Sequence, residues 1–378
     1  RDLTRLIFSG LTKPDSRGRP VPDLANWIIS ADQKTYTFIV KPTASWHDGQ
    51  PLTAQDVAFT IELMRDPASP LSEDLRNLWS AVGVVVTDTQ TIALTLPEPF
   101  APFLDYTSFG ILPQHVLGTT PAAGLAQAPF NLQPVGSGPF QFQRWRVGND
   151  NVVNGIELTA FPNYIAGKPA MGGVNFRFYP DTETAFQAYR DGEVQGLSRI
   201  PDDRLSDAMG LQDLNLYTAY EPQTTMIFLN MRDEALPFFR EKRVRQALLL
   251  GLNRDRVVAD VLNGQASVAS SPIQPGSWAF AGDLAPTPYD PARAAKLLDD
   301  AGWVLPADAV PGTSTYVRSK DSVQLSFTLV VPESARHTQI AQMAQNDWSA
   351  IGVQVQVITV PASTLRPQYL DTRTYQAL

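Results

Sequence analysis

The chain contains no cysteine among its 378 residues. This absence excludes disulfide bonds, thiolate metal ligands and a cysteine nucleophile. Histidine is also scarce, and no two of His47, His115 and His337 have the spacing of a helical His-Glu-x-x-His metal site. We therefore expect no metal site, no cofactor and no catalytic residues.

Long apolar runs and clusters of basic residues are missing as well. No stretch approaches the ~18 uninterrupted apolar residues of a membrane span. No signal peptide precedes Arg1, so we expect the chain to be a processed or trimmed piece of a longer protein. With 30 basic and 38 acidic residues, the net charge of −8 argues against a nucleic-acid partner. The length favours two or three domains.

The most informative segment comprises residues 21–64. Within it, residues 35–40 alternate with the period of two that is typical of a strand. Thr53 stands three residues before Asp56, a variant of the capping box, and predicts the start of a helix. Asp66-Pro67 is expected to end that helix.

Alternation and capping signals continue along the chain and predict a mixed α/β protein. After about residue 224 the pattern changes to longer α/β units, which end in a strand, a helix and a second strand over residues 323–357. Such a βαβ crossover is expected to have parallel, right-handed connectivity. The other expected elements are a hairpin at 82–96, strands at 140–142, 156–160, 174–178 and 226–230, and helices at 181–191, 242–251, 254–262 and from Asp290-Pro291 to Gly302.

Four features invite a chemical interpretation. His47-Asp48 lies in a turn and is interpreted as structural. Residues 136–139 lack both the Lys-Ser/Thr of a phosphate loop and a Gly-x-Ser-x-Gly nucleophile motif, which favours a tight connection. The basic cluster at 240–245 fits a solvated helix face, a salt bridge to another lobe or an anion site. Trp278 stands in a loop where no periodic pattern requires a core residue, and its aromatic side chain suits the lining of a binding cleft.

Short motifs follow one another in a characteristic order. Residues 21–64 contain Pro-Asp-Leu-Ala, Thr-Tyr-Thr-Phe, Trp-His-Asp-Gly and Leu-Thr-Ala-x-Asp-Val. Later motifs are Ile111-Leu112-Pro113, Pro134-Val135-Gly136-Ser137-Gly138-Pro139-Phe140, Gly192-Glu193, Phe228-Leu229-Asn230, Arg243-Val244-Arg245-Gln246-Ala247-Leu248, Asn253-Arg254 and Pro275-Gly276-Ser277-Trp278. This series resembles the extracellular solute-binding proteins of family 5, the dipeptide- and oligopeptide-binding components of ABC importers.

The resemblance implies an α/β fold of the periplasmic-binding-protein type II. Two lobes joined by a hinge are expected, with mixed sheets flanked by helices and an inserted small α+β domain. Carried onto this chain, residues 1–10 and 135–220 form a discontinuous first-lobe domain, and residues 11–134 form the inserted small domain. Residues 221–378 form a second-lobe α/β domain that is expected to be incomplete at its C-terminal end.

The resemblance also implies a function. An extended peptide is captured in a cleft between the lobes by hinge closure and delivered to ABC transporter permease subunits in the membrane. The protein is expected to act as a monomer outside the cytoplasm, in the periplasm or lipid-anchored at the outer face of the cell membrane. The strand end at 197–199 and the crossing at 220–226 are expected to line the cleft with Trp278. The expected ligand-binding residues are Leu197, Ser198, Arg199, Tyr220, Gln223, Thr224, Met226 and Trp278.

The sequence departs from the family pattern at two places. Gln195 stands where the family usually has an aspartate, and the segment that commonly supplies a carboxylate for the peptide α-amino group is expected to lie beyond Leu378. Which solute is bound therefore stays open. A nickel chelate, an oligosaccharide and haem are alternatives within the same fold. A ligand sensor is an alternative of another class, and an enzyme such as a hydrolase lacks a visible nucleophile-base pair.

Overall fold

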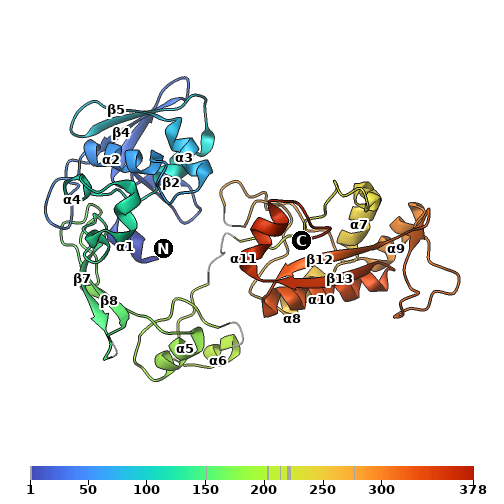
Figure 1. The fold of residues 1–378 in the computed structure, drawn as a ribbon. Coiled ribbons are helices and arrows are strands. Elements are labelled where there is room, and N and C mark those ends of the chain that lie inside the picture. Colours follow the sequence, from blue (N-terminus) through green and yellow to red (C-terminus); the bar gives the residue numbers. More distant parts are fainter. Residues whose placement is uncertain (1, 150, 202–203, 213, 219–222, 276) are drawn as a thin grey trace. The chain divides into compact units, whose positions relative to one another are not determined.

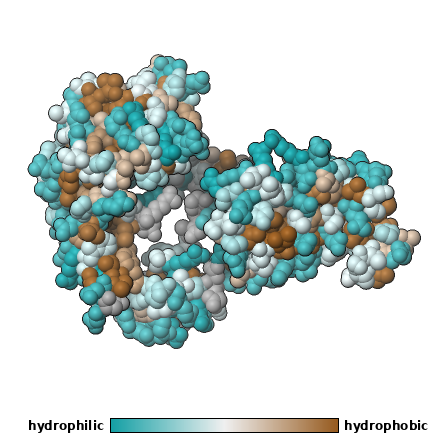
Figure 2. Space-filling view, viewed as in Figure 1, coloured by the Kyte–Doolittle hydropathy of each residue, from teal (hydrophilic) through white to brown (hydrophobic). Residues whose placement is uncertain are grey.

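The computed structural model describes the 378-residue chain apart from residues 1, 150, 202–203, 213, 219–222 and 276 (Figure 1). Two compact units are present, and each is described by itself: unit 1 is Arg1–Pro201 with Gly276–Trp278, and unit 2 is Asp202–Pro275 with Ala279–Leu378. On the face shown in Figure 2, hydrophilic side chains cover most of both units, with scattered apolar patches. None of the helices in the described ranges is both long enough and apolar enough to cross a membrane.

Unit 1 contains two separate hydrophobic cores. The described elements of unit 1 are α1 (Asp2–Ile7), β1 (Thr12–Pro14), β2 (Pro20–Pro22), β3 (Ala25–Ile29), β4 (Thr35–Val40), α2 (Ala54–Arg65), α3 (Glu73–Ser80), β5 (Gly83–Val86), β6 (Thr91–Thr95), η1 (Ala101–Thr107), α4 (Gln114–Leu117), η2 (Ala122–Gln127), η3 (Pro129–Asn131), β7 (Phe140–Val147), β8 (Val153–Ala160), β9 (Gly173–Arg177) and α5 (Thr182–Arg190). The three-domain division expected from the sequence stays a prediction.

The larger core of unit 1 lies under a four-stranded antiparallel sheet with the order β3-β4-β6-β5. Tyr36, Phe38 and Val40 of β4 are buried, and the residues between them are more exposed, so the predicted strand is confirmed. The predicted hairpin is also confirmed, because β5 and β6 pair antiparallel. We call this buried cluster, which extends from Leu11 to Ile111, the sheet core.

Helix α2 begins where its capping signal predicts. The backbone N–H of Thr53 donates to a carboxylate oxygen of Asp56 at 2.9 Å, which satisfies a donor at the start of the helix. The other oxygen of Asp56 accepts from the backbone N–H of Gln114 at 2.9 Å, so this cap also anchors α4. The helix ends at Arg65, just before Asp66-Pro67.

The smaller core of unit 1 belongs to a three-stranded antiparallel sheet, β7-β8-β9. We call it the N-terminal core because Ile7 of α1 packs there beside side chains of β7 and β8. Its strands confirm the predictions at 140–142, 156–160 and 174–178, and Asp181 caps α5 by accepting from the backbone N–H of Thr184 at 2.7 Å.

Unit 2 is built on a parallel strand pair. Its described elements are α6 (Leu205–Met209), η5 (Pro237–Arg240), α7 (Lys242–Leu250), α8 (Arg254–Asp260), α9 (Pro291–Asp300), β10 (Ser319–Lys320), β11 (Val323–Gln324), β12 (Ser326–Pro332), α10 (Ala335–Ala350), β13 (Gln354–Val360), α11 (Ala362–Thr364) and the π-helix η6 (Leu365–Leu370). Strands β12 and β13 pair parallel, as the predicted crossover requires, and α10 runs along one face of the pair (Figure 1).

Two strand predictions in unit 2 need correction. The predicted strand at 323–331 is interrupted at Leu325, because β11 pairs with β10 while β12 pairs with β13. Residues 226–230 do not form a regular strand. They make a single bridge, Leu229 to Ala377, flanked by hydrogen bonds between the backbones of Phe228 and Leu378. Ala377 also forms a parallel bridge with Leu329 of β12. The short segments around Leu229 and Ala377 therefore lie beside the parallel strand pair.

Candidate functional site

A concavity of about 570 Å³ opens on unit 2. Alternation along β12 produces its floor, because Phe327 and Leu329 belong to the buried core whereas Thr328 and Val330 face the other side of the strand pair. We call this site the unit 2 groove. It is lined by Asn230, Arg232, Asp233, Thr328, Val330, Ile358, Tyr369, Arg373, Thr374, Tyr375 and Gln376.

Side-chain hydrogen bonds fix one wall of the groove. The amide nitrogen of Asn230 donates to the carbonyl oxygens of Arg373, at 3.2 Å, and Tyr375, at 2.8 Å. The side-chain oxygen of Gln376 accepts from the backbone N–H of Thr328 at 2.6 Å. Residues 373–376 are thus attached to both sides of the groove. Arg373 itself has φ of 57°, an uncommon conformation for a residue with a side chain.

The lining combines both charge signs with an apolar floor. Two of the lining residues, Arg232 and Arg373, are basic, and one, Asp233, is acidic. One oxygen of Asp233 accepts from the backbone N–H of Ala235 at 3.0 Å. Cationic groups therefore outnumber acidic ones in this groove, although the whole chain carries a net charge of −8. Such an arrangement suits a solute with an anionic group and an aliphatic part.

The expected ligand-binding residues of unit 2 lie upstream of the groove. Gln223 and Met226 are exposed, and the Thr224 hydroxyl accepts from the side-chain amide of Gln274 at 3.0 Å. Tyr220 lies outside the described residues. None of the three described side chains lines the unit 2 groove, so the structure groups Thr224 with Gln274 rather than with Arg373. Their role in binding stays a prediction.

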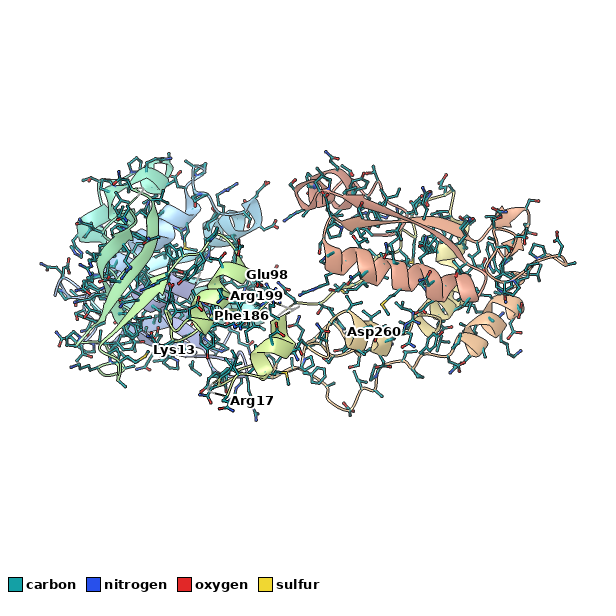
Figure 3. The ribbon with its side chains drawn as sticks, turned by 90° about the horizontal axis from the view of Figure 1, so that it is seen from below. Lys13, Arg17, Glu98, Phe186, Arg199 and Asp260 are labelled. Carbon is teal, nitrogen blue, oxygen red and sulfur yellow. The ribbon has the colours of Figure 1, made fainter. Side chains whose placement is uncertain are left out.

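The other expected ligand-binding residues belong to unit 1. Leu197 is half-buried, while Ser198 and Arg199 are exposed on irregular backbone. The strand end expected there is wrong, because the described residues 192–200 make no sheet pairing. Figure 3 shows Arg199 in the same light-green part of unit 1 as Phe186 of α5. The Trp278 side chain is 68% exposed, which leaves its surface available for contact. Participation of these residues in binding stays a prediction.

His47 has a structural environment. Its half-buried ring packs against Phe161 in an edge-on arrangement, with ring centroids 4.9 Å apart. Nδ1 accepts from the backbone N–H of Gly136 at 3.2 Å, and Nε2 donates to the carbonyl oxygen of Gly138 at 3.0 Å. Burial lowers the pKa of His47, so the neutral ring is favoured. Both ring nitrogens are occupied by backbone groups, and neither is available as a general base.

Residues 136–139 form the tight connection that the sequence predicts. The backbone N–H of Gly138 donates to the carbonyl oxygen of Ile7 at 2.8 Å. At both Gly136 and Gly138 a β-carbon would collide with the backbone of residues 6–7. The glycines therefore permit close chain crossing rather than phosphate binding.

The basic cluster at 240–245 is explained by contacts within unit 2. The Arg240 guanidinium donates to the carbonyl oxygen of Met231 at 2.9 Å, and that of Arg243 donates to the carbonyl oxygen of Asp300 at 2.8 Å. Arg245 likewise donates to the backbone of the preceding turn, at Phe239. These three arginines therefore donate to backbone carbonyl oxygens of unit 2, one of them at the C-terminal end of α9.

No pattern in the sequence predicted that these residues line a common groove. Arg232 and Arg373 are 141 positions apart, and neither stands in a motif with a chemical signature. The one sequence signal for the groove is the polar run Asp371-Thr372-Arg373-Thr374. It has no apolar periodicity that would assign it to the core. Within the described ranges, no three His, Cys, Asp or Glu side chains are placed to hold a metal ion together.

Comparisons with known proteins agree on one family. The model of bacterial extracellular solute-binding proteins, family 5 Middle, matches residues 19–378. Oligopeptide-binding protein AppA of Bacillus subtilis (strain 168) is 29% identical over 379 residues, which cover 97% of this chain and 66% of that protein. A putative ABC transporter peptide-binding protein of Brucella ovis is 32% identical over 292 residues, 75% of this chain and 52% of the relative. The chain thus spans between about half and about two thirds of the length of these curated relatives.

Solved structures give the same result. The structure of NikZ from Campylobacter jejuni in complex with Ni(L-His) has a TM-score of 0.72 at 26% identity, covering 99% of this chain and 71% of that one. The structure of AppA from Bacillus subtilis in complex with a nonapeptide has a TM-score of 0.69 at 27% identity, covering 100% of this chain and 73% of that one.

Proposed function

The chain belongs to the bacterial extracellular solute-binding proteins of family 5, and from this membership we propose that it captures peptides for an ABC importer. The observation that carries the proposal is the match of the family model over residues 19–378, together with curated relatives whose names specify peptide binding. The expected type II periplasmic binding fold is confirmed by the structural neighbours. No catalytic step forms part of the proposed function.

Binding of an extended peptide draws on two kinds of contact. Main-chain hydrogen bonds fix the peptide backbone, and roomy side-chain pockets tolerate sequence variation. The unit 2 groove has the mixed chemistry of such a pocket, with the apolar side chains of Val330 and Ile358 beside polar and charged groups. In unit 1, the exposed indole of Trp278 is the strongest candidate contact. Hinge closure around the solute is the expected means of retaining it.

The proposal includes a location and a partner. An importer component of this family works outside the cytoplasm and transfers its solute to permease subunits in the membrane. The protein is proposed to act there as a monomer. Co-purification of the full-length gene product with its neighbouring permease subunits, and its recovery from the extracytoplasmic fraction, would test these two parts.

A direct test of the binding function uses isothermal titration of the full-length gene product. Pools of dipeptides to octapeptides are titrated in turn, and the melting temperature is recorded with and without each pool. Binding to the native state alone raises the melting temperature by mass action. Heat release and a raised melting temperature with a peptide pool support the proposal. Silence across every pool, with heat release from another solute, overturns the peptide assignment.

A chelated metal is the second candidate solute. One observation favours it, namely the 26% identity and TM-score of 0.72 to a protein whose structure contains Ni(L-His). A chelate brings most of its own ligands, so few protein ligands are needed. Titration with nickel and L-histidine together, compared with each alone, separates this candidate from the peptide assignment.

A further inference from the structure

The chain between α8 and α9 forms a long loop, residues 265–289, whose described part contains neither a helix nor a strand. It carries Trp278, one of the predicted ligand-binding residues. We propose that Arg254 is a positioning residue for solute capture, because it fastens this loop at two points and keeps it ordered before a peptide arrives. The inference rests on the proposed peptide-binding function and names a residue on which the binding site depends.

A single guanidinium group joins two distant parts of the 265–289 loop. One terminal nitrogen of Arg254, Nη1, donates to the carbonyl oxygen of Ala269 at 3.3 Å, and the other, Nη2, donates to that of Thr287 at 2.5 Å. These two carbonyl groups bracket residues 270–286, so Arg254 closes that stretch of chain at its base. A guanidinium suits this role because its several donors are fixed in one plane and point in different directions.

Arg254 projects from a firmly held part of unit 2. The backbone N–H of Asn253 and the guanidinium of Arg256 each donate to the carboxylate of Asp347 at 2.8 Å. Asp347 belongs to α10 and is only 5% exposed, and Asn253 also caps α8 by accepting from the backbone N–H of Arg256 at 3.0 Å. The residues on both sides of Arg254 are thus attached to α10. A side chain that starts from a rigid element can fix a loop accurately.

Side-chain burial contributes little to the order of the 265–289 loop. Most of its described residues are exposed, and none of these described residues is fully buried. The apolar side chains of Ile273 and Leu284 are 42% and 50% exposed. Segments with few buried contacts open at a low cost in free energy. The order of this loop therefore depends on hydrogen bonds such as those that Arg254 donates.

A second contact connects the loop to another predicted ligand-binding residue. The side-chain amide of Gln274 donates to the hydroxyl of Thr224 at 3.0 Å. Gln274 and Trp278 both lie within the stretch that Arg254 closes, so loss of the Arg254 contacts affects two parts of the predicted site at once. A loop that is ordered in advance does not lose conformational entropy on binding, and this saving appears as higher affinity.

Isothermal titration of the full-length gene product provides the first test. The probe is the tightest-binding member of the pools of dipeptides to octapeptides. Arg254→Gln should weaken binding on the order of 10-fold, because the solute must then order the loop. Arg254→Lys keeps the charge but offers one ammonium group in place of the fork, so its affinity should lie between those of Arg254→Gln and the unsubstituted protein.

Hydrogen exchange of the backbone amides, followed by mass spectrometry, separates positioning from a purely structural role. In the free protein, Arg254→Gln should increase exchange several-fold at residues 266–287 and leave exchange in α10 unchanged. Saturation with the peptide should restore the protection of the loop, because the bound solute then orders it.

Arg243→Gln is the matched control for both measurements. It removes an equal charge and also a hydrogen bond to a backbone carbonyl oxygen, but the acceptor is Asp300 of α9, outside the 265–289 loop. It should change neither the exchange of the loop nor the affinity for the peptide. Melting temperatures of all three variants establish that they are folded.

The outcomes separate this inference from the proposed function. Full affinity of Arg254→Gln for the peptide overturns the inference, and so does a loss of affinity without faster exchange in the loop. Both results leave the proposed function intact. Failure of the unsubstituted protein to bind any peptide overturns the proposed function and, with it, the role of Arg254 in peptide capture.

Discussion

The Nε2–H of His47 donates a hydrogen bond to the carbonyl oxygen of Gly138, 3.0 Å away and 91 positions later in the chain. The same ring accepts from the backbone N–H of Gly136, which requires the neutral Nε2–H tautomer. Gly138 in turn donates to Ile7 of the N-terminal core. His47 therefore links the turn before α2 to the crossing that joins the two cores of unit 1.

The stability of unit 1 should depend on pH through His47. Burial lowers its pKa below the usual value of 6.5, so above that pH the ring is neutral in both the folded and the unfolded chain. As the pH falls below 6.5, the unfolded chain takes up the proton first, and the free energy of unfolding falls. Urea denaturation at intervals from pH 8 to pH 5 should show this loss. His47→Gln should reduce the pH dependence and cost about 1–2 kcal/mol at pH 8.

His337 of unit 2 is the matched comparison for this measurement. Burial and the nearby charge of Arg336 lower its pKa, so it contributes to the pH dependence with the same sign. His337→Gln should leave the His47 contribution in place, and the double variant should lose both. A His47→Gln variant that keeps the full wild-type pH dependence would contradict the assignment.

Gly136 should tolerate no side chain. A β-carbon there would overlap the carbonyl oxygen of Ile7, a backbone atom that can shift only if the chain around it moves as well. We expect Gly136→Ala to lower the free energy of unfolding by about 3 kcal/mol or more, measured by urea denaturation. Gly172→Ala is the control, because a β-carbon at Gly172 meets no atom within 4 Å. Equal stability of the two variants would show that the crossing relaxes.

Local signals explain which elements the sequence predicted correctly. The Thr53 capping box, the Asp290-Pro291 helix start and the alternation along β4 are each determined by neighbours within a few positions, and each is present in the structure. The crossover from β12 through α10 to β13 was equally clear, because its three segments have different hydrophobic periods.

Long-range pairing explains the errors and the omissions. Residues 226–230 have a strand-like composition, but pairing depends on Ala377 and yields one bridge instead of a ladder. The unit 2 groove depends on the contact from Asn230 to Arg373 and on a positive φ at an arginine, neither of which leaves a local pattern. The sequence therefore predicted the family and much of the fold better than the unit 2 groove.

Arg318 should be a major determinant of the stability of unit 2. The residue is buried, and its guanidinium donates to the carbonyl oxygens of Ile351, at 2.8 Å, and Trp303, at 2.7 Å, and pairs with Asp299. Arg318→Met should cost about 3 kcal/mol, because two buried carbonyl oxygens lose their donor. Guanidinium chloride denaturation provides the measurement.

Arg243→Met provides the comparison for Arg318. Arg243 also donates to a backbone carbonyl oxygen, that of Asp300, but it is exposed, so water replaces the lost donor. Its substitution should cost less than about 1 kcal/mol. Similar losses for the two arginines would mean that burial of Arg318 contributes nothing to its effect.

Trp278 should matter for binding and hardly at all for folding. Its side chain is 68% exposed, so truncation removes little packing, and Trp278→Ala should change the free energy of unfolding by less than about 0.5 kcal/mol. Peptide affinity, measured by isothermal titration of the full-length gene product, should fall on the order of 10-fold, because a large aromatic surface gives binding energy at low entropic cost. Tyr217→Ala is the control, since that aromatic side chain is 91% exposed and was not predicted to contact the solute. If both variants keep wild-type affinity, Trp278 does not contact the solute. If both lose affinity equally, the loss is not specific to the predicted site.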